Sequence, residues 1–358
     1  MQNKEIELKF GFDGDARNLH QVFANIGRVS GETTLHLDNT YFDTDKRDFF
    51  SFKAGLRIRI ADNYSEQTLK VKGESAGGLH KRSEYNIPVE RNTKVPDLSL
   101  FPQEAFPAGF DTESVQKELK PVCNISFERK LFNFEILDSV FEVAYDHGII
   151  KVADASYPLN ELEIELKESS VKSDELLNLF SILCSKLAEN DIPLLLEPFS
   201  KMHRATLLQE RNKNVVDVTE LSNADDLVSH ISKQISLFEQ MYGLYLISLE
   251  ANLLSFVLTQ LKELICSLKA LKRRNYYAFL PMQREPVEYM DDLKVIIRLL
   301  KSFYRRCNVV YKKMSRARLK ENIDRYEELS LEIRKAELHS KIFLIPLKLR
   351  QLISLINK

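Results

Sequence analysis

The sequence predicts an α+β protein: an eight-stranded antiparallel β-barrel tunnel with covering helices, followed by an all-α helical bundle domain. Three observations support this prediction. Strands that alternate charged and apolar residues recur through the first half of the chain. From Asp225 onward the apolar residues follow a helical period, and Gly243 is the last glycine. The charge is divided, because residues 1–200 carry a net −11 and residues 201–358 a net +10, which indicates two domains.

The first strand, Glu5-Ile6-Glu7-Leu8-Lys9, sets the pattern. Because alternate side chains of a strand point to opposite faces, Glu5, Glu7 and Lys9 share one face and Ile6 and Leu8 share the other. We expect the charged face to line the tunnel and the aliphatic face to pack beneath covering helices. A turn at 11–14 and a helix at about 16–26 follow this strand.

The later strands repeat this pattern with both signs of charge, and their number is consistent with a closed barrel. A connection with helical pieces occupies residues 91–122, Tyr145-Asp146-His147-Gly148 is expected to be a hairpin turn, and a helix covers about 174–190. The expected strands are 35–43, 56–60 with Arg57 and Arg59, 68–72 with Lys70 and Lys72, 82–87 with Arg82 and Glu84, 125–136 with Arg129, 140–144, 149–152, and 160–166 with Glu161, Glu163 and Glu165.

Charged side chains inside a barrel are costly unless they are paired, solvated or bound to a ligand. Clustered carboxylates suit a hard divalent cation such as Mg²⁺ or Mn²⁺. Arginine and lysine suit phosphate oxygens. A tunnel that carries both therefore predicts a metal-complexed polyanion as its ligand, and a polyphosphate chain fits that description.

At these residues the sequence resembles the CYTH superfamily, the triphosphate tunnel metalloenzymes, and is most similar to bacterial inorganic triphosphatases that carry a C-terminal CHAD-like helical domain. Together with Ser200-Lys201, the matching stretches span nearly all of residues 1–205. They are Glu5-Ile6-Glu7-Leu8-Lys9 as the E-x-E-x-K signature, Asn39-Thr40-Tyr41-Phe42-Asp43-Thr44, Gly55-Leu56-Arg57-Ile58-Arg59, Gln67-Thr68-Leu69-Lys70, 77–86, and Glu161-Leu162-Glu163-Ile164-Glu165-Leu166-Lys167.

The resemblance implies a role for each tunnel residue. Glu5 and Glu7 would bind the metal that bridges the triphosphate, and Glu163 and Glu165 would place a second metal and orient the attacking water. Supporting acids would be Glu84, Asp146 and Glu161. Phosphate oxygens would be held by Lys9, Arg57, Arg59, Lys70, Lys72, Arg82, Arg129 and Lys201. His80 and His147 are interpreted as structural or exposed, since isolated histidines beside turns usually are.

The resemblance implies a hydrolase that uses Mg²⁺ or Mn²⁺ to split inorganic triphosphate into pyrophosphate and phosphate. The same residues would serve thiamine triphosphate, a nucleoside triphosphate, an RNA 5′ end or the cyclisation of ATP. A non-catalytic polyphosphate-binding module is a third hypothesis. No Walker A motif is present, because Gly73-Glu74-Ser75-Ala76-Gly77-Gly78 lacks the following Lys-Ser/Thr.

The second half predicts a helical bundle at residues 220–358, after a tunnel domain at residues 1–210 and a linker near 210–224. The resemblance to CHAD domains implies polyphosphate binding on its basic helical surface. The region is about half the usual two-bundle length and lacks a His-x-x-Arg arrangement, so a solvated basic face is the favoured interpretation. The basic residues are Lys272, Arg273 and Arg274, and, along the helix near 287–320, Lys301, Arg305, Arg306, Lys312, Lys313, Arg316, Arg318 and Lys320. The other candidate helices are 224–240, 243–274, 316–339 and 341–357.

The remaining features indicate a cytoplasmic protein. The four cysteines form no C-x-x-C pair, which favours isolated thiols in a reducing compartment. The N-terminal region has no apolar signal core, and the apolar stretch 241–265 carries Glu250, Gln260, Lys262 and Glu263, so a bundle helix is favoured over a membrane span. A pI near 6.7 and the absence of a nucleic-acid-binding motif disfavour a nucleic-acid partner.

Overall fold

A computed structural model describes residues 2–76, 79–172, 175–210, 227–273 and 286–356. The chain forms two compact units. The first unit comprises Met1–Ser75, Leu79–Val171 and Phe199–Asn214, and the second comprises Ala76–Gly78, Lys172–Pro198 and Val215–Lys358. Residues 172–198, which the sequence analysis counts with residues 1–210, thus group with the helices of the second half. The predicted linker near 210–224 falls almost wholly outside the described residues.

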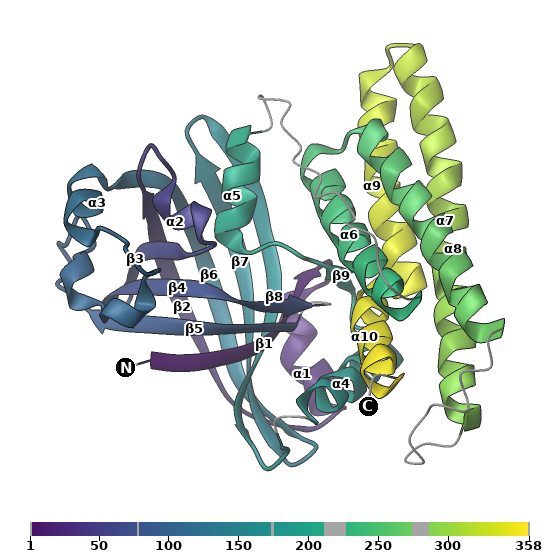
Figure 1. The fold of residues 1–358 in the computed structure, drawn as a ribbon, viewed down its shortest axis with the longest axis horizontal. Helices are drawn as coiled ribbons and strands as arrows, with labels where there is room; N and C mark the ends of the chain where they lie inside the picture. The colour runs from purple at the N-terminus through teal and green to yellow at the C-terminus, as the bar shows by residue number, and fades with distance from the viewer. Residues whose placement is uncertain (1, 77–78, 173–174, 211–226, 274–285, 357–358) are drawn as a thin grey trace. The chain divides into compact units, whose positions relative to one another are not determined.

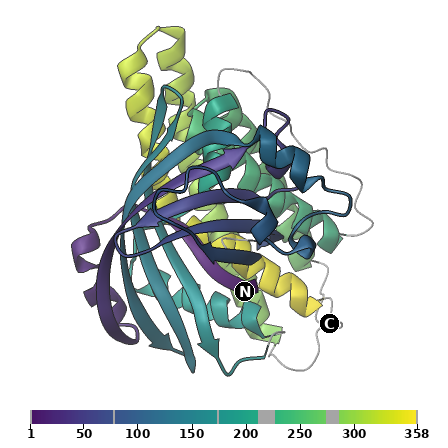
Figure 2. The same ribbon diagram turned by 90° about the vertical axis from the view of Figure 1, so that its left-hand side faces the viewer.

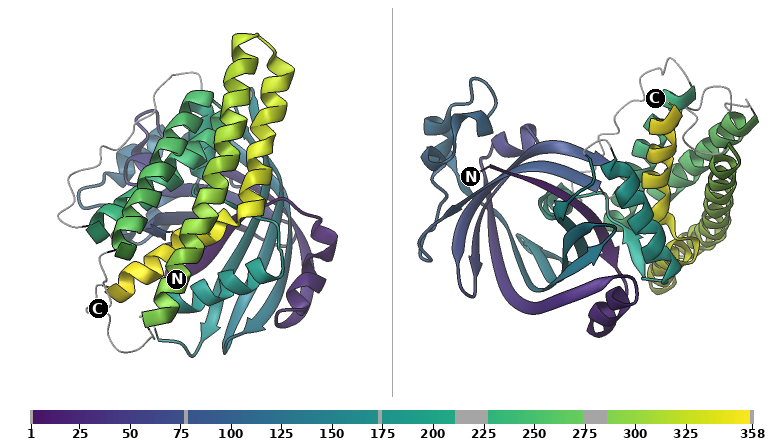
Figure 3. Two further views of the ribbon diagram at one scale, coloured as in Figure 1. Left: turned by 90° about the vertical axis from the view of Figure 1, so that its right-hand side faces the viewer. Right: turned by 90° about the horizontal axis from the view of Figure 1, so that it is seen from below.

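The first unit is a closed antiparallel barrel, as the sequence predicts (Figure 1). Its strands follow the order β5-β4-β3-β2-β6-β7-β8-β1, and β1 pairs again with β5 to close the circle. They curve around a common axis in the views of Figure 2 and Figure 3. The strands are β1 (Gln2–Phe12), β2 (Arg28–Asp43), β3 (Gly55–Ala61), β4 (Ser65–Ala76), β5 (Leu79–Pro88), β6 (Lys120–Ile136), β7 (Ser139–Val152) and β8 (Ala155–Ser169).

The strand register places charged residues opposite one another. Glu5 on β1 faces Arg82 on β5, while Lys9 faces Glu163 and Glu7 faces Glu165 on β8. The even-numbered residues of β1 point to the other face, where Leu8 and Phe10 are completely buried. The predicted alternation of β1 is therefore present, with apolar residues on one face and charged residues on the other.

The expected hairpin turn at 145–148 is wrong, because these residues continue the single strand β7. The two-residue turn that joins β6 to β7 is Leu137-Asp138, where both residues have positive φ. Gly148 serves close packing instead: a Cβ there would lie 2.2 Å from the Ser126 carbonyl oxygen and 2.5 Å from Phe127 Cα on β6. As a consequence, Asp146 lies inside a strand and is fully buried.

Helices and an aromatic cluster flank the barrel. The long connection between β5 and β6 contains two 3₁₀ turns and a short helix, in agreement with the sequence prediction. Its side chains pack with Phe42, Phe49 and Leu56 into an apolar cluster. Helix α5 packs on β6, β7 and β8. The helices of this unit are α1 (Leu19–Ala24), α2 (Asp48–Ser51), α3 (Thr112–Glu118) and α5 (Lys201–Glu210).

The second unit is a helical bundle with an apolar core that includes Tyr242, Leu261, Phe303 and Ile333. Its helix breaks differ from the predicted ones: Gly243 lies inside α6, and the break falls at Leu249, whose φ is positive. The elements are α4 (Leu176–Glu189), β9 (Leu194–Leu196), α6 (Leu227–Ser248), α7 (Ala251–Arg273), α8 (Pro286–Leu319), α9 (Ile323–Ser340) and α10 (Ile345–Ile356).

Among the described helices, α7 alone is long and apolar enough to cross a membrane by length and composition. Half of its most apolar window is buried within the protein. Leu254, Val257, Leu261 and Leu268 of this helix lie in the bundle core. These contacts agree with the prediction that this stretch is a bundle helix.

Candidate active site

Carboxylates and cations form a first network across β1, β3, β4 and β5. Both carboxylate oxygens of Glu5 accept hydrogen bonds of 2.9 Å from Lys70 Nζ. Lys70 also lies 3.4 Å from Glu84 Oε2, and Arg57 Nη2 lies 3.4 Å from Glu84 Oε1. Burial by itself would raise the pKa of Glu84, but Lys70 and Arg57 hold it below its ordinary value. This acid is therefore a stable anion between two cations.

A second network joins β6, β7 and β8 to helix α5. Arg129 donates to both oxygens of Asp146, at 2.6 and 2.7 Å, and to Glu163 Oε2 at 2.6 Å. Lys201, in the first turn of α5, reaches Asp146 at 2.9 Å and Glu163 at 2.6 Å. These cations hold the pKa of Glu163 well below its usual range, against the opposing effect of burial. Inward-pointing residues of three strands and the first turn of one helix together form this network.

Glu161 lies at the far side of the second network and is completely buried. Lys201 Nζ contacts its Oε1 at 2.5 Å, and Arg204 donates to its Oε2. Arg204 is 2 % exposed and was not among the predicted site residues. Its signal in the sequence is the spacing of three from Lys201, which places both side chains on one face of a helix.

Glu7 differs from the other tunnel acids because no cation pairs with it directly, and the nearby charges of Lys70 and Arg82 only partly offset its burial. It is 6 % exposed and has no hydrogen bond or ion pair among the described residues. Burial, and after it the charges of Glu5 and Glu163, raise the pKa of Glu7 well above its ordinary value. A buried carboxylate in this environment favours either a proton or a bound cation.

The remaining predicted cations lie on the same lining. Lys9 donates to the Phe199 backbone carbonyl and is almost fully buried. Arg59 donates to Asn39 Oδ1 at 2.8 Å and lies 3.7 Å from Glu66. Asn39 and Glu66 were not predicted as site residues, although Asn39 lies within one of the matching stretches.

Two predicted residues stand apart from these networks. Glu165 is 28 % exposed and pairs at 2.8 Å with Lys167, which also contacts Glu142. Burial raises the pKa of Glu165, while the hydrogen bond from Lys167 opposes the rise. Lys72 continues strand β4, and its side chain lies outside the described part of the protein. The predicted roles of all these residues stay predictions.

Carboxylate oxygens of Asp146, Glu161 and Glu163 lie within 4.8 Å of one another. Oxygen donors of this kind match Mg²⁺ or Mn²⁺ and do not match a soft metal. The sequence analysis placed two of these acids among the supporting residues and made Glu163 a metal ligand. Because Lys201 and Arg129 already compensate this group, the unneutralised Glu7 beside Glu163 is the stronger indication that a cation fits the tunnel.

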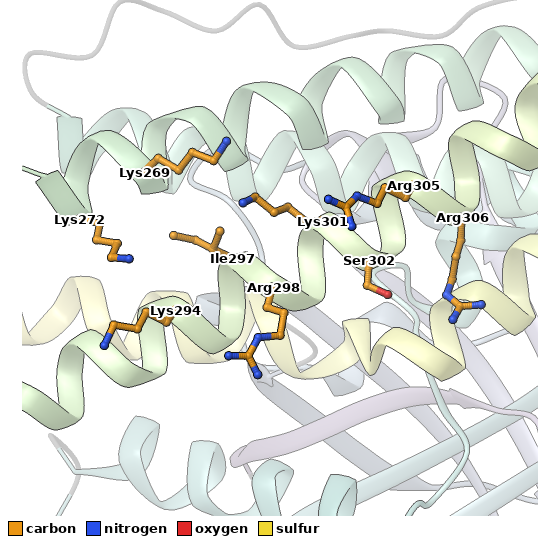
Figure 4. A pocket seen from close by; sticks show the side chains of 9 residues that line it. All are labelled: Lys269, Lys272, Lys294, Ile297, Arg298, Lys301, Ser302, Arg305 and Arg306. Atoms are coloured by element: carbon orange, nitrogen blue, oxygen red, sulfur yellow. The ribbon is translucent and has the colours of Figure 1, made fainter.

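The helical unit contains a separate basic hollow of about 650 Å³ between α7 and α8 (Figure 4). Lys269 and Lys272 come from α7 and the other basic side chains from α8, of which Lys301 reaches toward Lys269. Lys294 pairs with Asp291 at 2.7 Å, whereas the structure records no ion pair for the other basic residues within its described ranges. The lining consists of Lys269, Lys272, Lys294, Ile297, Arg298, Lys301, Ser302, Arg305 and Arg306.

The sequence analysis identified only part of this hollow. Lys272, Lys301, Arg305 and Arg306 were predicted as parts of a basic face, whereas Lys269, Lys294 and Arg298 were missed. The reason is that residues of two helices line the hollow. Residue spacing along one helix shows which side chains share a face, but it does not show which residues of the neighbouring helix lie opposite them. Arg274 lies outside the described residues.

A closed barrel lined by acids and cations defines the first unit as a charged β-barrel tunnel. Residues 3–193 match the sequence model of the CYTH domain, and the chain belongs to this family. It is 34% identical over 173 residues to the inorganic triphosphatase of Haemophilus influenzae. The match covers 47% of this chain and 47% of that relative, so the chain spans about half the length of the curated relative it matches.

Two solved structures share the fold loosely. A putative adenylyl cyclase from Hippeastrum, described as having a dominant triphosphatase activity, is 15% identical with a TM-score of 0.38, over 61% of this chain and 100% of that one. The PH1819 protein of Pyrococcus horikoshii is 18% identical with a TM-score of 0.34, over 57% and 99%. At these TM-scores the two structures add nothing to the family assignment.

Proposed function

We propose that the tunnel hydrolyses inorganic triphosphate to pyrophosphate and phosphate with Mg²⁺ or Mn²⁺. The observation that carries this proposal is that Glu7, buried and without an ion pair among the described residues, shares the tunnel with cations from β3, β4, β6 and α5. The likeness to the triphosphatase of H. influenzae supports the choice of substrate. The assignment to this chain is a proposal, because the alignment covers only half of that relative.

In the proposed complex, triphosphate oxygens replace carboxylates as partners of Arg57, Lys70 and Arg129. Glu5 and Glu7 would hold one divalent ion and Glu163 and Glu165 a second, and ions held there would offset phosphate charge and lower the pKa of water. A carboxylate of the chain orients the water for in-line attack on a terminal phosphorus. No covalent nucleophile is required, because positioning and charge neutralisation lower the barrier.

The decisive experiment is a substrate panel with the purified full chain. Tripolyphosphate, ATP and thiamine triphosphate are each incubated with Mg²⁺ and with Mn²⁺, and the products are separated. We expect phosphate and pyrophosphate from tripolyphosphate at the highest rate, and loss of this activity in Glu7→Gln. Faster turnover of thiamine triphosphate or ATP, or formation of cyclic AMP, would reassign the substrate. Binding without turnover of any triphosphate would favour a non-catalytic binding module.

For the helical unit we propose a second function, the binding of polyphosphate in the basic hollow. Six of its seven basic side chains have no described ion-pair partner, and Lys269, Lys272 and Lys301 are half-buried. Crowded cations repel one another, and a polyanion relieves that repulsion. Linear polyphosphate should bind the full chain, and Lys301→Ala with Arg305→Ala should weaken this binding. Lys312→Ala with Lys313→Ala removes equal charge from exposed positions of α8 outside the hollow and is the control.

A further inference from the structure

His80 lies in the tunnel and takes no part in the networks described above. It shares the face of β5 with Arg82 and Glu84, since residues two apart on a strand point the same way. Its position in the register is opposite Glu7 of β1. The side chain is 1 % exposed. A histidine at this place is enclosed by the tunnel lining.

Arg82 determines the tautomer of His80. The Nη2 atom of Arg82 lies 2.8 Å from Nδ1 of His80. A guanidinium has hydrogens to donate and no acceptor, so Nδ1 must be the acceptor of this hydrogen bond. In the neutral ring the proton is then on Nε2. The hydrogen bond from Arg82 therefore leaves the proton of the neutral ring on Nε2, where it can be donated.

The Nε2 atom of His80 has no hydrogen-bond partner within the described residues. Lys70 contacts Glu5, Arg129 contacts Asp146, and Lys9 contacts a backbone carbonyl. The Nε atoms of Arg57 and Arg204 also lack a partner among the described residues, but other nitrogens of both guanidinium groups donate to carboxylates. An unsatisfied donor that is completely buried is unfavourable and marks a place where an acceptor from outside the chain can bind. Burial, then the charges of Lys9 and Arg82, hold the pKa of His80 well below its usual value, in keeping with a neutral ring.

We propose that Nε2–H of His80 donates a hydrogen bond to a non-bridging phosphate oxygen of the substrate. This inference rests on the proposed triphosphatase function and adds a substrate-binding residue to it. Because the ring is neutral, it can contribute a hydrogen bond to the substrate without adding a further positive charge beside Lys9 and Arg82. It also supplies direction, because an imidazole N–H is fixed by the ring whereas an ammonium group rotates.

Two substitutions separate this role from the positioning of Arg82. His80→Gln can keep an amide donor near the position of Nε2, and His80→Asn can keep an acceptor near Nδ1. The probe is the imido analogue of triphosphate with Mg²⁺, whose bridging nitrogens resist hydrolysis, titrated calorimetrically into the full chain. We expect His80→Asn to weaken binding by about 10- to 100-fold, as for a lost hydrogen bond to a charged group, and His80→Gln to retain most of the affinity. Retention in His80→Asn with loss in His80→Gln would overturn the proposal in favour of the positioning of Arg82.

A measurement on the unsubstituted chain keeps the test valid if a variant fails to fold. With ¹⁵N-histidine labelling, the Nε2–H signal of His80 should be present in the free protein and should shift when the imido analogue binds. An unchanged signal, in a chain that binds the analogue, would overturn this proposal and leave the proposed function standing. A chain that neither binds nor hydrolyses triphosphate would overturn both.

Discussion

Glu7 is the tunnel acid whose negative charge is least compensated by cations. It lies between Glu5 and Glu163, and both of those acids have cationic partners while Glu7 has none among the described residues. In the absence of a divalent cation, a proton is the simplest means of reducing this charge. Because the pKa of Glu7 is raised in the folded state, its ionisation lowers the stability of the metal-free protein as pH rises above the value of an unfolded glutamate.

We therefore expect opposite effects of Glu7→Gln on stability and on activity. At pH 8 without metal, the variant should be at least as stable as the natural protein, because an uncompensated buried charge is removed. With Mg²⁺, activity on triphosphate should fall by about 100-fold or more. Thermal unfolding in EDTA and phosphate release with Mg²⁺ are the two measurements. A large loss of stability in EDTA would show that Glu7 has a structural partner.

At the scale of single elements, strand β7 shows both the strength and the weakness of sequence patterns. The alternation of charged and apolar residues predicted the lining of β1, β3, β4 and β8 because each strand contains its own evidence. The sequence Tyr145-Asp146-His147-Gly148 suggested a turn, since glycine and aspartate are common in turns. The close approach of β6 is what requires Gly148, and no local pattern records a neighbour that lies more than 20 residues away in sequence.

Gly148→Ala is expected to destabilise the barrel. The added Cβ would overlap the Ser126 carbonyl oxygen and Phe127 Cα. Both are backbone atoms of β6, which cannot rotate away as a side chain can, so the two strands must separate. Overpacking of this kind costs about 1–3 kcal/mol. Gly55→Ala is the matched control, because its Cβ would meet its nearest neighbouring atom, Tyr41 Cε1, at an ordinary 3.8 Å. Urea unfolding of both variants measures the difference, and equal stabilities would contradict the close approach.

Helix α9 contains a buried acid that should make the helical unit sensitive to pH. Glu337 is fully buried and accepts hydrogen bonds from Tyr242 Oη and the Leu196 backbone N–H. Burial raises its pKa to about 8, although these hydrogen bonds oppose the rise. Because the pKa is raised in the folded state, protonated Glu337 stabilises the folded protein. This stabilisation is complete below about pH 4.5, the pKa of an unfolded glutamate, and is lost as the pH rises through 8.

Glu337→Gln should flatten this dependence. The amide preserves the volume of the side chain and cannot ionise, so the stability of the variant should change less between pH 5 and 9. Thermal melts followed by circular dichroism over that range provide the measurement. Glu327→Gln, at an exposed position of the same helix, should leave the dependence as it is in the natural protein. A pH profile shared by all three proteins would contradict a neutral Glu337.

At the scale of the whole molecule, each unit assembles cations in a different way. In the barrel, Arg57 is buried, Lys70 and Arg129 are half-buried, and all three are already paired with acids. Period-two alternation revealed these cations because the barrel gives every strand the same inner face. Arg204 and His80 were missed as site residues, since the former reaches the tunnel from a helix and the latter depends on a contact with Arg82. In the helical unit, the opposing residues of α7 and α8 could not be matched from sequence.

This difference predicts that salt separates the two anion sites. Exposed charges are screened strongly, because the Debye length falls from about 10 Å at 0.1 M salt to about 3 Å at 1 M. Polyphosphate binding to the half-exposed hollow should weaken by roughly tenfold or more over this range. Binding of the imido triphosphate analogue with Mg²⁺ in the tunnel should weaken much less, since Lys9, Arg57 and Lys201 are buried and salt screens buried charges less than exposed ones.

Calorimetric titrations of the full chain at both salt concentrations test this prediction, with two variants that assign each site. Lys301→Ala with Arg305→Ala should weaken the salt-sensitive binding and leave the salt-resistant binding intact. Glu7→Gln should impair only the salt-resistant, metal-dependent binding. Loss of both kinds of binding in either variant would mean that a single site takes both anions, and equal salt dependence would mean that the tunnel is as open to solvent as the hollow.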